Sequence, residues 1–108
     1  MKMNKTVKKL DNNVIKALTE VCEEAKSSIQ GFAWLTHTAN YANFPASLLV
    51  TCVFSTEDAL QDAKLYGHDT TLIKLIHSTL LNTGILLKQP KHNVTFDTDE
   101  AGAEQRLL

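Results

Sequence analysis

Two apolar segments separated by only six residues place the strongest constraint on how this chain can fold. Residues 32–40 and 47–54 both have the apolar alternation of β-strands. The connection over residues 41–46 is too long for a two-residue turn, yet a parallel return would need a dozen or more residues. We therefore predict an antiparallel hairpin onto which the rest of the chain packs.

The faces of the two predicted strands differ in character. Strict alternation along residues 32–40 places Phe32, Trp34, Thr36 and Thr38 on one face and Leu35 on the other. Residues 47–54 are apolar on both faces, which is typical of a strand in the middle of a sheet. The predicted helices cover only one face of the first strand. Which face they cover decides whether Trp34 is buried.

A long amphipathic helix is predicted before the hairpin. Apolar residues recur at steps of three and four over residues 10–28, which gives a single stripe wide enough to lie on a sheet. Asn4 or Thr6 could cap its start. Gly31 is placed to end it in the left-handed conformation.

Two further helices are predicted after the hairpin. A hydroxyl cap followed by acidic residues at 55–58 begins a short helix that reaches Lys64. Asp69 or Thr70 then caps a second main helix that runs to Asn82, and Gly84 stops it.

The C-terminal third is predicted to form a second hairpin. Residues 85–88 and 92–96 are its strands, residues 89–91 are its turn, and residues 98–100 open a short final helix. The fold class is then α+β in one domain over residues 1–108. We predict a mostly antiparallel sheet of about four strands with two main helices on one face, in the order α-β-β-α-β-β.

Charge and composition exclude some functions. The net charge is −1, and the basic residues are ten lysines and the single Arg106, which disfavours sequence-specific reading of DNA. No apolar stretch follows the N-terminal lysines, and no apolar run is long enough to cross a bilayer, so we expect a cytoplasmic protein without a membrane partner. Cys22 and Cys52 fall within apolar patterns and are expected to be small hydrophobic residues in a reducing compartment.

Candidate catalytic and metal-binding residues are sparse. No glycine-rich phosphate loop, nucleophile elbow or zinc spacing occurs, so we expect neither a cofactor nor a metal and favour a protein that is not an enzyme. His37 is expected to be a hydrogen-bonded structural residue, with a general base as the alternative. The weak candidates for a polar site are the following side chains: His37, His92, Asp97, Asp99 and Glu100.

An aromatic surface on the first strand and its loop is the more specific candidate. Its residues have aromatic or hydroxyl-bearing side chains: Trp34, Thr36, Thr38, Tyr41 and Phe44. Core packing explains most aromatic residues. An exposed Trp34 would instead mark a protein interface or a stacking platform for single-stranded nucleic acid.

Three segments together carry a resemblance to a known family. They are Gly31-Phe32-Ala33-Trp34-Leu35-Thr36-His37, Phe44-Pro45-Ala46-Ser47-Leu48 and Val94-Thr95-Phe96-Asp97-Thr98-Asp99-Glu100-Ala101. With their spacing, the chain resembles a family of small gammaproteobacterial proteins often labelled "Fis family transcriptional regulator". The resemblance implies a role in regulating transcription. Fis proper ends in a basic helix-turn-helix that no residue of this acidic, arginine-poor C-terminus matches, so the resemblance assigns no site residue.

Three functions follow as hypotheses. The first is a non-enzymatic interaction or dimerisation module, either a homodimer or a binder of an unknown protein partner, that uses the aromatic strand face or an unpaired sheet edge. The second is a nucleic-acid-associated accessory protein that uses the lysine-rich N-terminal arm. The third is a small metal-binding protein or enzyme that uses His37, His92 and Asp97.

Overall fold

The predicted hairpin between residues 32 and 54 is present and forms the centre of the fold. The structure, a computed structural model, describes residues 5–100. Its helices are α1 (Lys5–Ser28), α2 (Glu57–Leu65) and α3 (His68–Leu81), and its strands are β1 (Phe32–Thr38), β2 (Leu49–Phe54) and β3 (Val94–Thr98). Two short 3₁₀ turns, η1 (Tyr41–Asn43) and η2 (Pro90–His92), precede β2 and β3.

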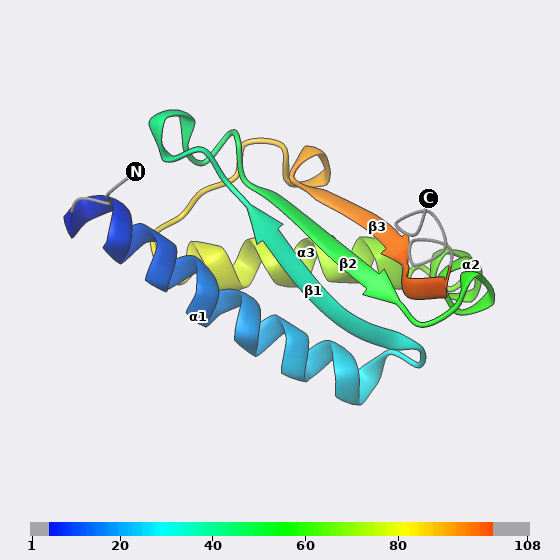
Figure 1. Cartoon of the computed structure of the whole chain (residues 1–108). Coiled ribbons are helices and arrows are strands. Elements are labelled where there is room, and N and C mark those ends of the chain that lie inside the picture. The colour runs from blue at the N-terminus through cyan, green and yellow to red at the C-terminus, as the bar shows by residue number, and fades with distance from the viewer. Residues whose placement is uncertain (1–4, 101–108) are drawn as a thin grey trace.

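The three strands form one mixed sheet in the order β1-β2-β3 (Figure 1). β1 and β2 are antiparallel, which confirms the hairpin, and β2 is central, as its two apolar faces predict. β3 pairs in parallel with the other side of β2. The α+β class is therefore correct, whereas four strands and a mostly antiparallel sheet are not.

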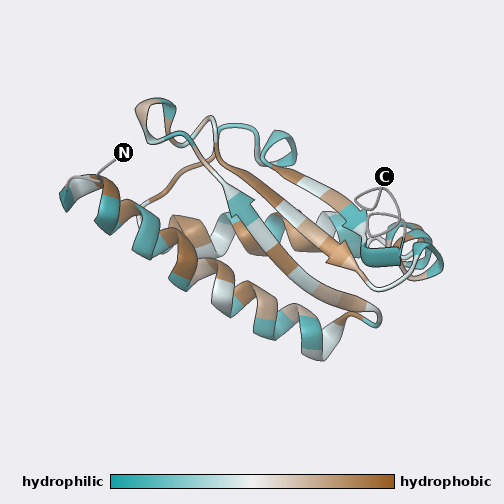
Figure 2. Ribbon diagram, in the orientation of Figure 1, coloured by the Kyte–Doolittle hydropathy of each residue, from teal (hydrophilic) through white to brown (hydrophobic). Residues whose placement is uncertain are grey.

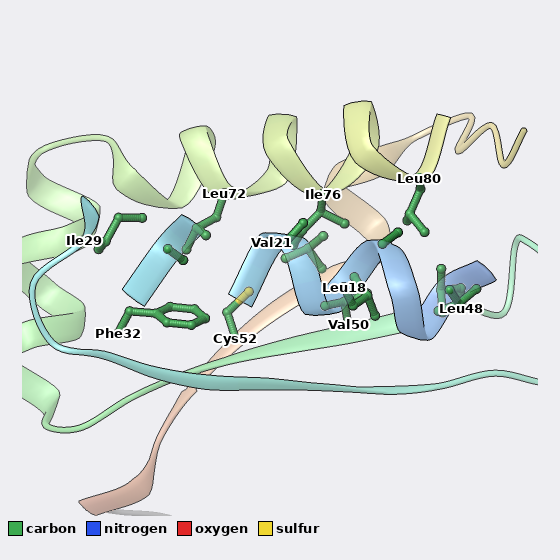
Figure 3. Packing of buried hydrophobic residues seen from close by; sticks show 14 of the residues in the cluster. Leu18, Val21, Ile29, Phe32, Leu48, Val50, Cys52, Leu72, Ile76 and Leu80 are labelled. Atoms are coloured by element: carbon green, nitrogen blue, oxygen red, sulfur yellow. The ribbon is translucent and has the colours of Figure 1, made fainter. Parts of the chain in front are cut away.

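The two long helices lie on the same face of the sheet, as predicted (Figure 1). β2 is predominantly hydrophobic in Figure 2, while α1 alternates hydrophobic and hydrophilic bands. Figure 3 shows side chains of α1 and α3 pointing toward those of β1 and β2. The largest of the almost completely buried side chains are the following: Phe54, Leu48, Leu72, Ile76, Leu80, Val14, Val21, Val50 and Cys52. This layer is the hydrophobic core that holds the helices to the sheet.

A β-bulge changes which residues of β1 share a face. Phe32 pairs with Phe54, but Trp34 pairs with Val53, so Ala33 is an extra residue in β1. Phe32 therefore faces the helices, where its ring meets Phe54 edge-on at 5.8 Å between centroids. Trp34, two residues later, faces the other way. The prediction that Phe32 and Trp34 share one face is wrong because an inserted residue shifts the alternation.

The second predicted hairpin is absent. Residues 85–88 have no strand partner among residues 5–100, although Ile85 and Leu87 are buried in the core. Their alternating burial resembles that of a strand, but their backbone lies outside the sheet. The predicted strand at residues 92–96 begins two residues later and ends at Thr98.

Asn93 ties the start of β3 to the residues just before β2. Its buried side-chain amide donates to the carbonyl oxygens of Leu48 at 2.7 Å and Pro45 at 3.2 Å, with Ala46 at 3.5 Å. The start of β3 is thereby fixed beside the start of β2, and both strands then run in the same direction.

α2 and α3 begin and end within about three residues of their predicted bounds, whereas α1 includes residues 5–9 before its predicted start at residue 10, so Thr6 lies inside the helix and is not its cap. α1 starts at Lys5 and α2 is capped by the Thr56 hydroxyl, which accepts from the amide of Ala59 at 3.1 Å. For α3 the cap is Gly67, with a φ of 78°, and not Asp69 or Thr70. Asp99 and Glu100 are helical, and the remainder of the predicted final helix lies outside the described residues.

Candidate interaction surface

One face of the sheet has no helix of residues 5–100 over it (Figure 1). The side chains on this open face come from all three strands, as the pairing register shows: Trp34, Thr36 and Thr38 from β1, Leu49, Thr51 and Val53 from β2, and Thr95 and Asp97 from β3. Trp34 is 38% exposed and Leu49 is 39% exposed. We name this set of residues the open face.

The open face is organised in rows across the strands. Trp34, Val53 and Asp97 form one row, so Trp34 and Asp97 are separated by about 10 Å, twice the spacing between strands. Thr36, Thr51 and Thr95 form the next row, and Thr38 lies opposite Leu49 in the last. The face is thus apolar at both ends, hydroxyl-bearing in the middle, and charged only at Asp97.

Tyr41 and Phe44, predicted to share a surface with Trp34, belong to a different part of the molecule. Their rings contact one another at 5.0 Å between centroids. Phe44 packs against the core and lines a pocket of about 450 Å³ together with Leu86 and His92. The predicted surface therefore keeps Trp34, Thr36 and Thr38 and loses the two loop aromatics.

His37 lies on the helix side of β1, within a polar clasp that joins three segments. The Asp11 carboxylate on α1 accepts a hydrogen bond from the Tyr41 hydroxyl at 2.6 Å, and His37 Nε2 lies 3.5 Å from the same oxygen. Burial raises the pKa of Tyr41, and the hydrogen bond to Asp11 and its negative charge raise it further. The clasp places a carboxylate oxygen beside His37, and the interpretation of this residue as a hydrogen-bonded structural histidine stays a prediction.

The weak polar candidates do not form one site. His92 lines the pocket beside Phe44, whereas Asp97 lies on the open face, where its carboxylate accepts from the amide of Thr98 at 2.8 Å. Glu100 accepts from the amide of Glu57 at 3.0 Å and so caps α2 from outside. Asp99 is exposed. Within residues 5–100, no three His, Cys, Asp or Glu side chains are grouped so that they could hold a metal ion.

The two cysteines lie on the helix side of the sheet. Cys52 is fully buried on β2, and burial, with a smaller contribution from Cys22, raises the pKa of its thiol to about 12. Cys22 on α1 is partly exposed and lines a groove of about 370 Å³ between α1 and β1. A thiol as well buried as Cys52 is a packing residue and a poor nucleophile.

Several residues that matter to the surface were not foreseen. Leu49, Thr51 and Thr95 complete the open face, and Asp11 holds His37 and Tyr41. The alternation of β2 and β3 contains the first three, but only the pairing register shows which side each one takes. Asp11 carries no signal of its own, because it is one polar residue in a long amphipathic helix.

Comparison with protein-family models, with curated proteins and with solved structures finds no match to this chain. The resemblance to the Fis-labelled family therefore stays a prediction. Within the described part of the chain, no helix has the length and apolar character needed to cross a membrane.

Proposed function

We propose that this protein is a non-enzymatic interaction module that binds a protein partner through the open face. The observation that supports the proposal is Trp34, an aromatic side chain 38% exposed on a sheet face that no described helix covers. Tryptophan is enriched among the residues that dominate binding energies in protein interfaces.

The composition of the open face agrees with a protein partner. Charged residues are depleted at the centres of protein interfaces, and here the only charge is Asp97, at one end of a row. The threonines of the open face offer hydroxyl groups that can donate and accept hydrogen bonds. Ordering these short side chains on binding costs less conformational entropy than ordering long ones. A partner that offers an apolar cleft for Trp34 and a polar rim for the threonines would match this face.

A nucleic-acid partner receives less support from the same face. Single-stranded nucleic acid needs cations that follow its phosphates beside the stacking aromatic residues. The open face carries no lysine, while Lys5, Lys8 and Lys9 project from α1, on the opposite side of the sheet. The basic and aromatic elements of that hypothesis are therefore separated.

The test compares two exposed apolar residues. Trp34→Ser removes the aromatic side chain from the open face, and Leu65→Ser changes a residue of α2 that is 76% exposed and lies off that face. Proteins captured by the wild type and by Leu65→Ser, but not by Trp34→Ser, are purified and titrated against all three chains. We expect Trp34→Ser to weaken binding by about tenfold or more.

The chain has one tryptophan, so its indole N–H resonance can be assigned without ambiguity. We expect this resonance to shift when the purified partner is added. Binding that is equally tight for Trp34→Ser and the wild type, with no shift of the indole resonance, would overturn the proposal.

A further inference from the structure

The outer edge of β1 has no strand partner among residues 5–100. Beyond the bulge, residues 34–38 form a regular edge of five residues without proline, lysine or any carboxylate. Natural proteins commonly protect such edges with charges, proline or a covering segment, because an unpaired edge is a template for another strand. Here the bulge at Ala33 lies before this segment, so the edge of residues 34–38 remains available to pair with another strand.

A groove with both apolar and charged side chains runs beside this edge. It separates α1 from β1 and is lined by Ile15, Cys22 and Glu23 from the helix and by Leu35 and His37 from the strand. Ile15 is 46% exposed, although it lies on the flank of a helix whose inner side is buried. If the added strand were the β1 of a second copy of this chain, the α1 helix of that copy would come to lie beside this groove.

The charges of α1 are divided between its two halves. Residues 5–16 carry four lysines and one aspartate, whereas residues 17–28 carry three glutamates and one lysine. Two such helices side by side and antiparallel would each place a basic half against an acidic half. The same two helices in parallel would place like charges together.

We propose that a second copy of this chain pairs with the outer edge of β1, antiparallel and about a two-fold axis through Thr36. Pairing of β1 with β1 would give a continuous six-stranded sheet, and the two α1 helices would meet beneath the seam at their exposed Ile15 side chains. This interface lies beside the open face and does not depend on whether the open face binds a partner.

The two-fold axis fixes which charges meet. The clasp sets His37 beside Asp11, and the groove sets Leu35 beside residues further along α1. Between these two points, we place the axis beside α1 at Lys16. Positions equally far on either side of Lys16 then face each other, and Lys9 of one copy meets Glu23 of the other. These residues share a helix side because they are fourteen positions apart.

The interface also contains one repulsion. Lys16 faces its own counterpart near the axis, where solvent reduces the cost. We expect Lys16→Ala to tighten the dimer for this reason.

Charge reversal tests the pairing directly by sedimentation velocity at low salt. Glu23→Lys and Lys9→Glu each replace two attractions per dimer with two repulsions. The dimer dissociation constant of each variant alone should therefore be about tenfold or more above that of the wild type. An equimolar mixture of the two variants restores both attractions and should form a heterodimer. The wild-type dimer should weaken as salt rises, because these pairs are exposed to solvent.

Glu24→Lys is the matched control, since it makes the same charge change at a residue that does not line the groove. It should dissociate no more readily than the wild type. A wild type that stays monomeric at high concentration, or a mixture that stays monomeric, would overturn the proposal.

Hydrogen exchange tests the strand half separately. The amides of residues 34–38 that face the outer edge should exchange more slowly in the wild-type dimer than in Glu23→Lys, and equal exchange of these amides in both would overturn strand pairing. Trp34→Ser should still dimerise, because the strand pairing uses backbone groups, although Trp34 lies within the paired strand and its loss should weaken the dimer slightly. Loss of partner binding without loss of the dimer therefore separates this interface from the open face.

Discussion

Trp34 lies opposite Val53 in the β1–β2 pair, and Val53 is only 5% exposed although it belongs to the open face. No helix within residues 5–100 covers this valine, and it is not part of the core cluster between helices and sheet. Trp34 is the partner of Val53 across the pair and has the largest side chain of the open face, so we expect it to shield the valine from water. Trp34 serves the isolated chain as well as any partner, and Trp34→Ser has to be checked for stability before its binding is interpreted.

Gly31, just before β1, allows a close approach between the backbone and α2. Its φ is 85°, and a Cβ added there would overlap the Cβ of Ala59. We expect Gly31→Ala to lower the free energy of unfolding by about 3 kcal/mol or more, because the left-handed backbone alone costs about 1–2 kcal/mol and the overlap adds to it. Urea denaturation measures this.

Gly67→Ala is the control for that substitution. Gly67 has a similar φ of 78°, but no atom lies within 4 Å of an added Cβ. It should lose only the backbone contribution. Equal losses at both glycines would show that Ala59 does not restrict the site.

Asn93 is expected to be intolerant of a negative charge. In Asn93→Asp a carboxylate would face the carbonyl oxygens of Pro45 and Leu48, which now accept from the amide. Repulsion raises the pKa of that carboxyl in the folded protein above about 4, its value in the unfolded chain. The variant should therefore lose stability as pH rises through this range, relative to the wild type.

Asn93→Ala provides the comparison without charge. It should lose about 1–3 kcal/mol, because the carbonyl oxygens lose their donor. That loss should not change between acid and neutral pH once the wild type is subtracted. A pH-independent loss in Asn93→Asp as well would contradict the proposed geometry.

The Asp11 clasp predicts a loss of stability at alkaline pH. The pKa of Tyr41 is raised in the folded protein, so the stability it contributes is complete below about pH 10 and is lost as pH rises above that value. Tyr41→Phe should lose the hydrogen bond at every pH, yet decline less steeply above pH 10. The Tyr66→Phe variant leaves Tyr41 as the only tyrosine. The ultraviolet absorbance of this variant should show that Tyr41 ionises at a higher pH in the folded protein than in the unfolded chain.

The two cysteines should differ in reactivity. Cys52 is fully buried with a pKa raised to about 12, while Cys22 is partly exposed. A thiol reagent at mildly alkaline pH should modify one thiol in the native protein and both after unfolding. In Cys22→Ser the rapid reaction should disappear, and its persistence would contradict the burial of Cys52.

The parts of the fold that sequence patterns predict are those decided by neighbours along the chain. The helical periodicity before Ser28 is enough to predict α1, and the short connection after β1 is enough to predict the antiparallel hairpin. β3 could not be placed in this way, because its position depends on Asn93 and on carbonyl groups 45 to 48 residues away. Residues 85–88 show the opposite error, since burial of alternate side chains predicts a strand even where residues 5–100 contain no strand that pairs with it.

The candidate surface divides along the same line. Alternation places Trp34, Thr36 and Thr38 on one face, and the pairing register agrees because the alternation is regular beyond the bulge. Phe32 was misplaced because an inserted residue leaves no mark in so short a strand. Tyr41 and Phe44 follow the strand in sequence, but the chain turns at η1, and Tyr41 then reaches Asp11 on α1.

The bulge at Ala33 makes β1 one residue longer than its pairing with β2 requires. Removing Ala33 would leave Phe32 toward the helices and Trp34 toward the open face, now in uninterrupted alternation. At this position the protein should accept a change in chain length without exchanging its inner and outer surfaces. A one-codon deletion there is a change that evolution or a designer could make, whereas the same deletion at Thr36 would move Trp34 to the helix side.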